Sequence, residues 1–393
     1  MGRAGAPTRA KAHEGRAAGT EPASAAPVHL KPLTGLRFLA ALLVVLYHVG
    51  LASRLLMPPI VGIGYVGVGF FFVLSGFILT YTYLDADGQL SRSRDAFWGA
   101  RIARVYPVYL VAYIIAVLPF VWHHDPRAHA ILTGLSTLTL TQAWLPWSAD
   151  AWNGPGWSLS CEAFFYLLFP VIAVPIARLS RRRLGLAVNL FWLVALAGPL
   201  LYIAWNPDGL HTWGWADSAW IRVVRFAPLI RLPEFLMGVA LGRMFVIDRT
   251  AVSVRGTARF SGMGLVPLIA LVGIGVVPCI GVPLPYILLH DGLLDPLFGL
   301  LIYGLAWNTG RVATCLAMPA MVALGEASYA LYILHVPLRD WLGRFISAPT
   351  AGDPRCLVYW SAYLCLCIAF ALLTMRFVER PARRAVRHAI VRG

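Results

Sequence analysis

The stretch Leu33-Thr-Gly-Leu-Arg37-Phe-Leu-Ala-Ala-Leu-Leu-Val-Val-Leu-Tyr-His48 carries two ionisable side chains inside an apolar run long enough to cross a membrane. At about 100° per residue, the steps from Arg37 to His48 make roughly three turns, so both side chains share one helix face about 16 Å apart. An Arg near the centre of a membrane helix costs about 2.5–3.5 kcal/mol to insert. The pair therefore predicts a functional site. The alternative is an Arg at the cytoplasmic interface and a His satisfied by a neighbouring helix.

The composition is typical of a membrane protein. Of the 393 residues, 59% are hydrophobic and 13% are charged, and the mean hydropathy is +0.70, which excludes an ordinary soluble domain. The formal charge of +15 would suit nucleic acid, but the basic residues are spread over several loops and tails rather than gathered in one domain. We therefore predict an all-α, polytopic membrane protein whose partner is the lipid bilayer and not nucleic acid.

Ten apolar stretches are long enough to span a bilayer. They lie near 36–54, 61–82, 105–122, 157–178, 184–205, 226–247, 262–283, 286–306, 320–345 and 357–378. With the N- and C-termini cytoplasmic, most basic residues fall on cytoplasmic segments, as the positive-inside rule requires. An additional span at 129–146 would place Arg181-Arg182-Arg183 outside, so we expect that stretch to be re-entrant or interfacial.

The two ends of the chain flank a single membrane domain. Residues 1–32 are rich in Ala, Gly, Pro and charge and lack the apolar core of a signal peptide, so we expect a disordered cytoplasmic tail. The membrane domain is expected over 33–381, and a basic cytoplasmic tail over 382–393. The six cysteines show no CxxC spacing, so we predict neither a metal site nor a disulfide framework.

Two groups of residues in expected outside loops invite other interpretations. His123, His124, Asp125 and His129 lack closed tetrahedral spacing, which favours solvated loop residues over a metal site. The Trp-rich segments 144–157 and 205–220 fall where interfacial aromatic residues are expected. Sugar stacking is the alternative for their tryptophans, Trp152, Trp213 and Trp215.

Six short patterns follow one another along the chain. They are Arg37 followed after ten residues by His48, Phe70-Phe-Phe-Val-Leu-Ser75-Gly76-Phe77, Arg101-Ile-Ala-Arg104-Val-Tyr106-Pro107, Trp157-Ser158-Leu-Ser160-Cys-Glu162-Ala-Phe-Phe165-Tyr166, Ser328-Tyr329-Ala-Leu-Tyr332-Ile-Leu-His335 and Glu379-Arg380-Pro381. In this order they closely resemble the integral-membrane acyltransferase family three, bacterial enzymes that O-acylate surface polysaccharides, glycolipids and some antibiotics. The departures are Ala100, where the family often has a further Arg, and Cys161, where it often has Val.

The resemblance implies the reaction and its partners. The expected donor is acyl-CoA, with acetyl-CoA foremost, and no metal is required. The expected acceptor is a hydroxyl of a carbohydrate, a glycolipid or a glycosylated antibiotic, and the expected location is the bacterial cell membrane. The family also implies that Arg37 and His48 form the catalytic core. His48 is then a general base for the acceptor hydroxyl or a transiently acylated imidazole, and Arg37 neutralises donor phosphates or the oxyanion.

The third span begins with the candidate donor-binding residues. Arg101 and Arg104 are one turn apart at its cytoplasmic end, with Tyr106 just above, a setting that suits the phosphates of acyl-CoA. Ordinary positive-inside anchoring is the alternative. Ser75 is a further donor-binding candidate. Its neighbour Gly76 permits close approach of a pantetheine arm or of another helix, and helix packing is the favoured interpretation from sequence alone.

Further polar residues lie in or beside the later spans. Glu162 is a catalytic candidate that would orient His48 or bind a sugar hydroxyl near the outer face. The alternative is a carboxylate at a helix N-terminus capped by Ser158 or Ser160. Weaker substrate-binding candidates are Trp157, Tyr332 and His335. Arg231 and Glu234 have the spacing to pair with each other.

Two other functional classes stay open on the sequence alone. A secondary transporter for a small polar or anionic solute would also line its path with buried Arg, His and Glu, but the chain shows no internal repeat. A sensor or scaffold gains nothing from the insertion cost of so many ionisable groups.

Overall fold

The computed structural model describes residues 1–2, 29–53, 58–123, 129–209, 218–255, 263–280, 284–350 and 352–392. Within them the chain forms helices joined by turns, and the one β-bridge pairs Leu84 with Leu90 between two helices. The α-helices are α1 (Lys31–Ser53), α2 (Pro59–Gly62), α3 (Gly67–Tyr83), α4 (Arg94–His123), α5 (His129–Leu138), α6 (Trp157–Ala177), α7 (Arg181–Trp205), α8 (Ala219–Phe226), α9 (Pro228–Arg255), α10 (Val266–Val276), α11 (Tyr286–His290), α12 (Asp295–Ala306), α13 (Gly310–Leu316), α14 (Pro319–Phe345), α15 (Arg355–Thr374) and α16 (Arg380–Arg392). Short 3₁₀ turns are η1 (Gly64–Val66), η2 (Gln142–Trp144), η3 (Gly154–Gly156) and η5 (Val277–Cys279), and η6 (Met375–Glu379) is a π-helical turn.

Eight segments of the described chain are long and apolar enough to cross a membrane. They are Lys31–Leu51, Gly64–Tyr83, Arg94–Leu118, Gly154–Ala177, Arg181–Trp205, Tyr286–Ala306, Pro319–Phe345 and Arg355–Val386. The all-α, multi-pass prediction is confirmed, but the count of ten is not. The stretch 226–247 forms α9, which has the length but carries several charges, and 262–283 holds only the short apolar helix Val266–Cys279.

The distribution of side chains is that of a bundle in lipid. Large apolar side chains such as Leu186 and Leu201 of α7 and Leu357 of α15 are exposed, at 64%, 67% and 74% of their surface. Charged and polar side chains such as Arg231 and His335 are fully buried instead. A helix bundle surrounded by hydrocarbon requires this arrangement, because lipid solvates Leu and does not solvate charge.

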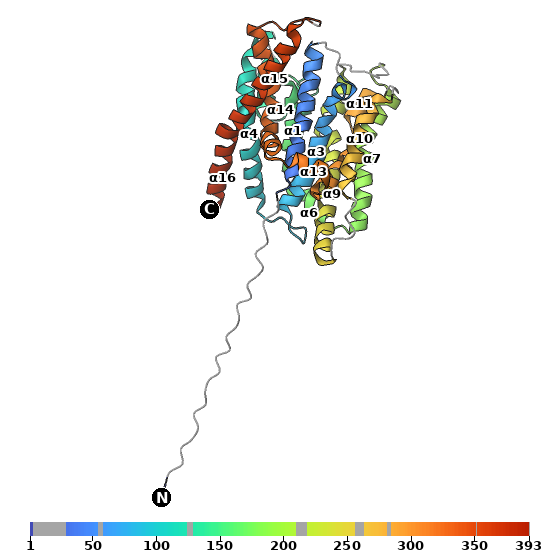
Figure 1. The fold of residues 1–393 in the computed structure, drawn as a ribbon, viewed down its shortest axis with the longest axis vertical. Helices are drawn as coiled ribbons and strands as arrows, with labels where there is room; N and C mark the ends of the chain where they lie inside the picture. Colours follow the sequence, from blue (N-terminus) through green and yellow to red (C-terminus); the bar gives the residue numbers. More distant parts are fainter. Residues whose placement is uncertain are drawn as a thin grey trace.

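The bundle places α1, α3, α6 and α9 centrally, with α4, α15 and α16 along one side and α7, α10 and α11 along the other (Figure 1). The closest packing joins α3 to α9. A Cβ on Gly76 would collide with the backbone of Phe235, and one on Gly238 with the carbonyl of Val73. Gly76 therefore serves helix packing, as predicted.

A second close pair, α1 with α14, fixes the helix that carries Arg37 and His48. A Cβ on Gly325 of α14 would collide with the backbone of Thr34, so α14 lies directly against the start of α1. This contact sets the rotation of α1 and brings the far ends of the two helices together.

Among the described residues, no candidate membrane span falls at 129–146, and a re-entrant or interfacial position for this stretch stays a prediction. The helix α5 has only 10 residues, and η2 and further turns follow it. Its apolar side chains Ile131, Leu132 and Leu135 are exposed. At the other end of the chain, most of the expected basic tail 382–393 is helical and belongs to α16, which packs against α4. Most of residues 1–32 lie outside the described part.

Candidate active site

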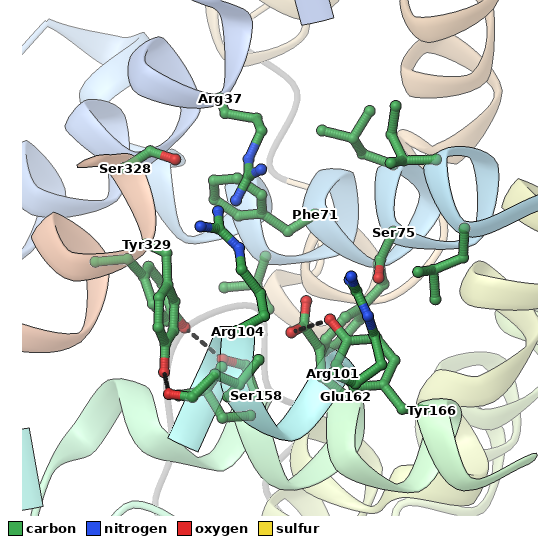
Figure 2. Close-up of a pocket in the computed structure, with 18 residues that line it drawn as sticks. Arg37, Phe71, Ser75, Arg101, Arg104, Ser158, Glu162, Tyr166, Ser328 and Tyr329 are labelled. Carbon is green, nitrogen blue, oxygen red and sulfur yellow. Dashed lines mark hydrogen bonds between the residues drawn. The ribbon is translucent and has the colours of Figure 1, made fainter. Parts of the chain in front are cut away.

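A cavity of ≈ 120 Å³ opens where α1, α3, α4, α6 and α14 converge. Among the side chains that line it are Arg37, Arg101 and Arg104, with Glu162 as the acidic member and Ser75 on the α3 wall. Figure 2 shows these side chains directed into one space from different helices. The structure thus gathers residues that are far apart in the sequence into what we call the arginine cavity.

Two guanidinium groups face each other across the arginine cavity. Figure 2 shows Arg37 and Arg104 reaching toward one another beside the ring of Phe71. Arg104 forms an ion pair with Glu379 of η6, which is fully buried, whereas Arg37 makes no hydrogen bond or ion pair with any described residue. Two cations that converge without a carboxylate between them favour an anion with several oxygens, such as a phosphate.

Arg101 is held by aromatic rings. Its Nη2 donates to the Tyr83 hydroxyl at 2.8 Å, and its guanidinium lies 5.1 Å and 5.9 Å from the ring centroids of Tyr83 and Tyr166. Rings that hold the guanidinium in this way leave its charge available to the cavity. Tyr166 in turn donates to Glu162 at 2.7 Å.

Glu162 is thus not among the residues that line the cavity of His48, and its catalytic role stays a prediction. Glu162 lines the arginine cavity, where its carboxylate offsets part of the positive charge, and its hydrogen-bond partner is Tyr166. The alternative of a capped helix start is wrong, because no side chain caps α6. Ser158 donates to the Pro155 carbonyl, and Ser160 accepts from the backbone of Ala143.

Tyr106 is not among the residues that line the arginine cavity, and its role in donor binding stays a prediction. Its hydroxyl donates to the carbonyl of Leu138 at 3.1 Å. Tyr109 and Tyr113, on the same face of α4, donate in the same way to Thr137 and Gly134. The three phenols thus attach the second half of α5 to α4.

A second cavity, of ≈ 200 Å³, lies further along α1 and contains His48. We call it the histidine cavity. It is lined largely by aromatic side chains, which are Tyr47, Tyr65, Trp157, Phe226, Tyr286 and Tyr332. Its polar members include Asp150, Arg225 and His290. The Arg225 guanidinium lies 4.5 Å from the centroid of Phe226 and 5.3 Å from that of Tyr286. Arg37 and His48, predicted to share one site, thus border two neighbouring cavities.

The hydrogen bonds of His48 determine which ring nitrogen is free. Its Nδ1 lies 2.9 Å from the Val44 carbonyl, and because a carbonyl only accepts, this nitrogen carries the proton. His335 lies behind it, with its own Nδ1 2.6 Å from the Tyr332 carbonyl and its Nε2 3.2 Å from His48 Nδ1. Neutral His48 therefore keeps the lone pair on Nε2, the nitrogen that a general base uses.

The predicted substrate-binding residues have different positions. Trp157 lines the histidine cavity and stacks on His290, and Tyr332 lines both cavities. His335 is fully buried and is not among the residues that line either cavity, and its contact with substrate stays a prediction. Its contacts indicate that it orients the His48 ring.

Next to both cavities lies a buried charge cluster that the sequence predicted only in part. Arg231 pairs with Glu234 at 2.9 Å, as predicted, and also with Asp291. Asp291 accepts from the Nδ1 of His290 at 2.6 Å, which places His290 in the wall of the histidine cavity. The signal was present as two acidic residues, Asp291 and Asp295, inside an otherwise apolar span.

Some of the other candidate residues lie outside the part of the chain that the structure describes. His124, Asp125, Trp213 and Trp215 belong to segments outside the described residues. Within the described ranges, no three His, Cys, Asp or Glu side chains are arranged to hold a metal ion. All six cysteines lie in described segments, each as a free thiol.

Comparison with known proteins supplies the family. A sequence model described as an acyltransferase domain matches residues 31–377. The chain belongs to this acyltransferase family. The match covers both cavities, and it identifies the chain as a membrane acyltransferase rather than a transporter or a scaffold.

Three relatives are named as acyltransferases. The chain is 29% identical to "Acyltransferase MdmB" of Streptomyces mycarofaciens, over 89% of this chain and 88% of that one. It is 25% identical to the "Putative peptidoglycan O-acetyltransferase YrhL" of Bacillus subtilis (strain 168), over 90% of this chain and 55% of the relative. It is 23% identical to the "Putative O-acetyltransferase SACOL0978" of Staphylococcus aureus (strain COL), over 91% of this chain and 58% of the relative. The chain thus spans little more than half the length of the last two. No solved structure matches.

Proposed function

We propose that this membrane acyltransferase moves an acyl group, acetyl foremost, from acyl-CoA to a hydroxyl of a carbohydrate, a glycolipid or a glycosylated antibiotic. The observation that carries the proposal is the pair of neighbouring cavities on one face of α1. One cavity is lined by three arginines and the other by a histidine with a free Nε2. Relatives named as O-acetyltransferases support acetyl as the acyl group.

In this proposal the arginine cavity receives the donor. In the arginine cavity, charge-assisted hydrogen bonds to the phosphate oxygens of CoA come from Arg37, Arg101 and Arg104. The planar, forked guanidinium group matches the arrangement of phosphate oxygens well. Ser75, on the α3 wall, contributes a hydroxyl to the pantetheine arm. Glu162 keeps Tyr166 in place and prevents an excess of positive charge in the empty cavity.

The histidine cavity holds the reacting atoms. Nε2 of His48 takes the proton of the acceptor hydroxyl, whose oxygen attacks the thioester carbonyl. The new C–O bond forms as the C–S bond breaks, and the proton leaves with the CoA thiolate as free thiol. A transient acyl-imidazole would use the same Nε2, and it differs in that acylated enzyme accumulates when no acceptor is present.

Acceptor binding fits the rest of the histidine cavity. Aromatic walls with a few polar groups are typical of sites for organic ligands that carry hydroxyls. We assign Trp157 and Tyr332 to the acceptor, with Asp150 as a hydrogen-bond acceptor for sugar hydroxyls. The name of the Bacillus subtilis relative, which refers to peptidoglycan, supports a carbohydrate acceptor.

The proposal includes an orientation in the bacterial cell membrane. The arginine cavity faces the cytoplasm, where acyl-CoA is made, and the membrane domain extends over 33–381 with both termini cytoplasmic. Positive charge supports this orientation, because α4 begins at Arg94, about two turns before Arg101, and α16, which packs against α4, contains further arginines.

The test is acetyl-CoA turnover by purified enzyme in detergent, followed as free thiol. Two acceptor probes are supplied, a peptidoglycan digest and a glycosylated macrolide. Wild type should release thiol in an acceptor-dependent manner, and His48→Ala should be slower by about 10²–10⁴-fold. His29→Ala is the matched control, since His29 precedes α1 and is not among the residues that line either cavity.

The outcomes separate the parts of the proposal. Equal rates for wild type and His48→Ala would remove His48 from the chemistry. Absence of thiol release by wild type with acetyl-, propionyl- and butyryl-CoA would contradict the acyl-CoA donor.

A further inference from the structure

We infer that Val68 and Tyr332 select the length of the acyl chain that reaches His48. This inference rests on the proposed function, and it names the residues that determine donor specificity. Only these two side chains line both cavities among the described residues. They therefore mark the boundary between the arginine cavity and the histidine cavity.

The boundary formed by Val68 and Tyr332 lies on the path that a bound donor would follow from the arginines to His48. Arg37 and His48 lie on the same face of α1, separated by about 16 Å of helix rise. A donor whose phosphates are held by Arg37 and Arg104 must extend its pantetheine arm past Val68 and Tyr332 for the thioester to reach His48. The acyl group is the leading end of the arm, so it meets this boundary first.

On α3 the boundary consists of one short side chain between two glycines. A Cβ on Gly67 would contact Val44 of α1 at 3.0 Å, and a Cβ on Gly69 would lie 3.6 Å from Arg231 and from Glu234. Gly67 therefore lets α3 approach α1 closely, whereas a Cβ at Gly69 would make only ordinary van der Waals contact with the charge cluster. Val68 is left as the side chain of this stretch that lines both cavities, so its volume affects how an acyl group moves from one cavity to the other.

On α14 the boundary is held in place by hydrogen bonds. The Tyr332 hydroxyl lies 2.8 Å from the Ser158 hydroxyl and 3.1 Å from the Pro155 carbonyl, and with Ser158 donating to that carbonyl, Tyr332 donates its one proton to Ser158 or to Pro155. Ser158 lines the arginine cavity, and Pro155 lines the histidine cavity. Tyr332 is 6% exposed, so its ring is a fixed wall and a change on the Val68 side is not absorbed by movement of the tyrosine.

Size selection follows from this geometry. A well-packed site distinguishes chains that differ by one methylene by roughly 10–200-fold. Removing two carbon atoms from residue 68 should admit longer acyl groups, and adding one should exclude all but the shortest. Acetyl is then the natural substrate because it passes Val68 without displacing it.

The experiment compares acyl-CoA thioesters in the thiol-release assay with the same peptidoglycan digest and glycosylated macrolide. For Val68→Ala, the ratio of kcat/KM for butyryl-CoA to that for acetyl-CoA should rise about 10-fold over wild type. For Val68→Leu, the ratio for propionyl-CoA to acetyl-CoA should fall. Val73→Ala is the matched control, because Val73 is a fully buried valine of α3 that is not among the residues lining either cavity.

The two variants at position 68 change volume in opposite directions, so loss of one to misfolding leaves the other informative. Unchanged ratios in a folded Val68 variant, with wild type active on acetyl-CoA, would overturn this inference alone. An equal change of the ratio in Val73→Ala would also overturn it. A wild-type enzyme that releases thiol from none of the thioesters would overturn the proposed function, and the inference with it.

Discussion

The arginine cavity and the histidine cavity lie side by side on α1, and they differ in the electrostatic environment that their side chains create. In the arginine cavity, guanidinium groups converge, and two carboxylates compensate them: Glu162, which lines the cavity, and Glu379, which is buried behind Arg104 and pairs with it. In the histidine cavity, aromatic rings surround a neutral imidazole whose proton is held by a carbonyl. The arginine cavity suits the binding of an anion, and the histidine cavity suits proton transfer. Roughly three turns of α1 separate these two environments.

Replacing Arg37 or Arg104, which face each other in the arginine cavity, should have the largest effect, a rise in KM for acetyl-CoA. Arg37→Ala and Arg104→Ala each remove a charged donor from the arginine cavity, and a hydrogen bond to a charged group contributes about 1.5–3 kcal/mol. We expect KM for acetyl-CoA to rise about 10–100-fold in each variant, with a smaller change in kcat, as measured by initial rates of thiol release.

Arg181→Ala is the control for charge alone. Arg181 pairs with Asp248 at 2.9 Å and is not among the residues that line either cavity. A wild-type KM in both Arg37→Ala and Arg104→Ala would show that the arginine cavity does not bind the donor.

The next effect concerns the carboxylate that compensates Arg104. Glu379→Gln leaves the Arg104 charge without its buried partner, and an unsatisfied buried group costs about 1–3 kcal/mol. We expect a lower melting temperature in detergent and, because a bound phosphate replaces the lost carboxylate, a larger stabilisation by CoA than in wild type.

The control for this variant is Glu326→Gln. Glu326 pairs with Arg380 where both side chains are 40% exposed or more, so little stability should be lost. If Glu379→Gln melted like wild type, or if CoA stabilised it less, Glu379 would have no part in preparing the donor site.

The smallest effect should come from Tyr106. Tyr106→Phe removes one hydrogen bond to the Leu138 carbonyl, for which we expect a stability loss of about 0.5–1.5 kcal/mol, measured by thermal unfolding. KM for acetyl-CoA should equal that of wild type, as it should in Tyr113→Phe, whose hydroxyl binds Gly134. A raised KM for acetyl-CoA in Tyr106→Phe, but not in Tyr113→Phe, would support a role for Tyr106 in donor binding.

Much of the fold was predictable because apolar length is a local property. Eight of the predicted spans are helices of sufficient length and apolarity, and no candidate span of the described chain falls at 129–146, the stretch that the positive-inside rule led us to exclude. The stretch 226–247 shows the limit of that reasoning. Its helix α9 carries Arg231 and Glu234 into the centre of the bundle, where partners from the span 286–306 compensate them, so hydropathy alone does not describe it.

Helix periodicity predicted those features of the candidate site that depend on the spacing of residues within one helix. The shared face of Arg37 and His48 and the one-turn spacing of Arg101 and Arg104 follow from 3.6 residues per turn. Position within the recurring patterns assigned Tyr106 to the donor and His335 to the substrate, and neither residue is among those that line the two cavities. A side chain's neighbours come from other helices, and a single helix pattern contains no information about them.

The sequence by itself determined that this is an all-α membrane protein with ionisable groups on one face of its first span, because apolarity and periodicity are read along the chain. Only the tertiary structure decided that these groups border two cavities, that His335 backs His48, and that Val68 and Tyr332 stand between the cavities. The reason is physical. Close helix packing at Gly76, Gly238 and Gly325 sets how α3, α9, α14 and α1 are rotated against one another, and those rotations determine which side chains meet.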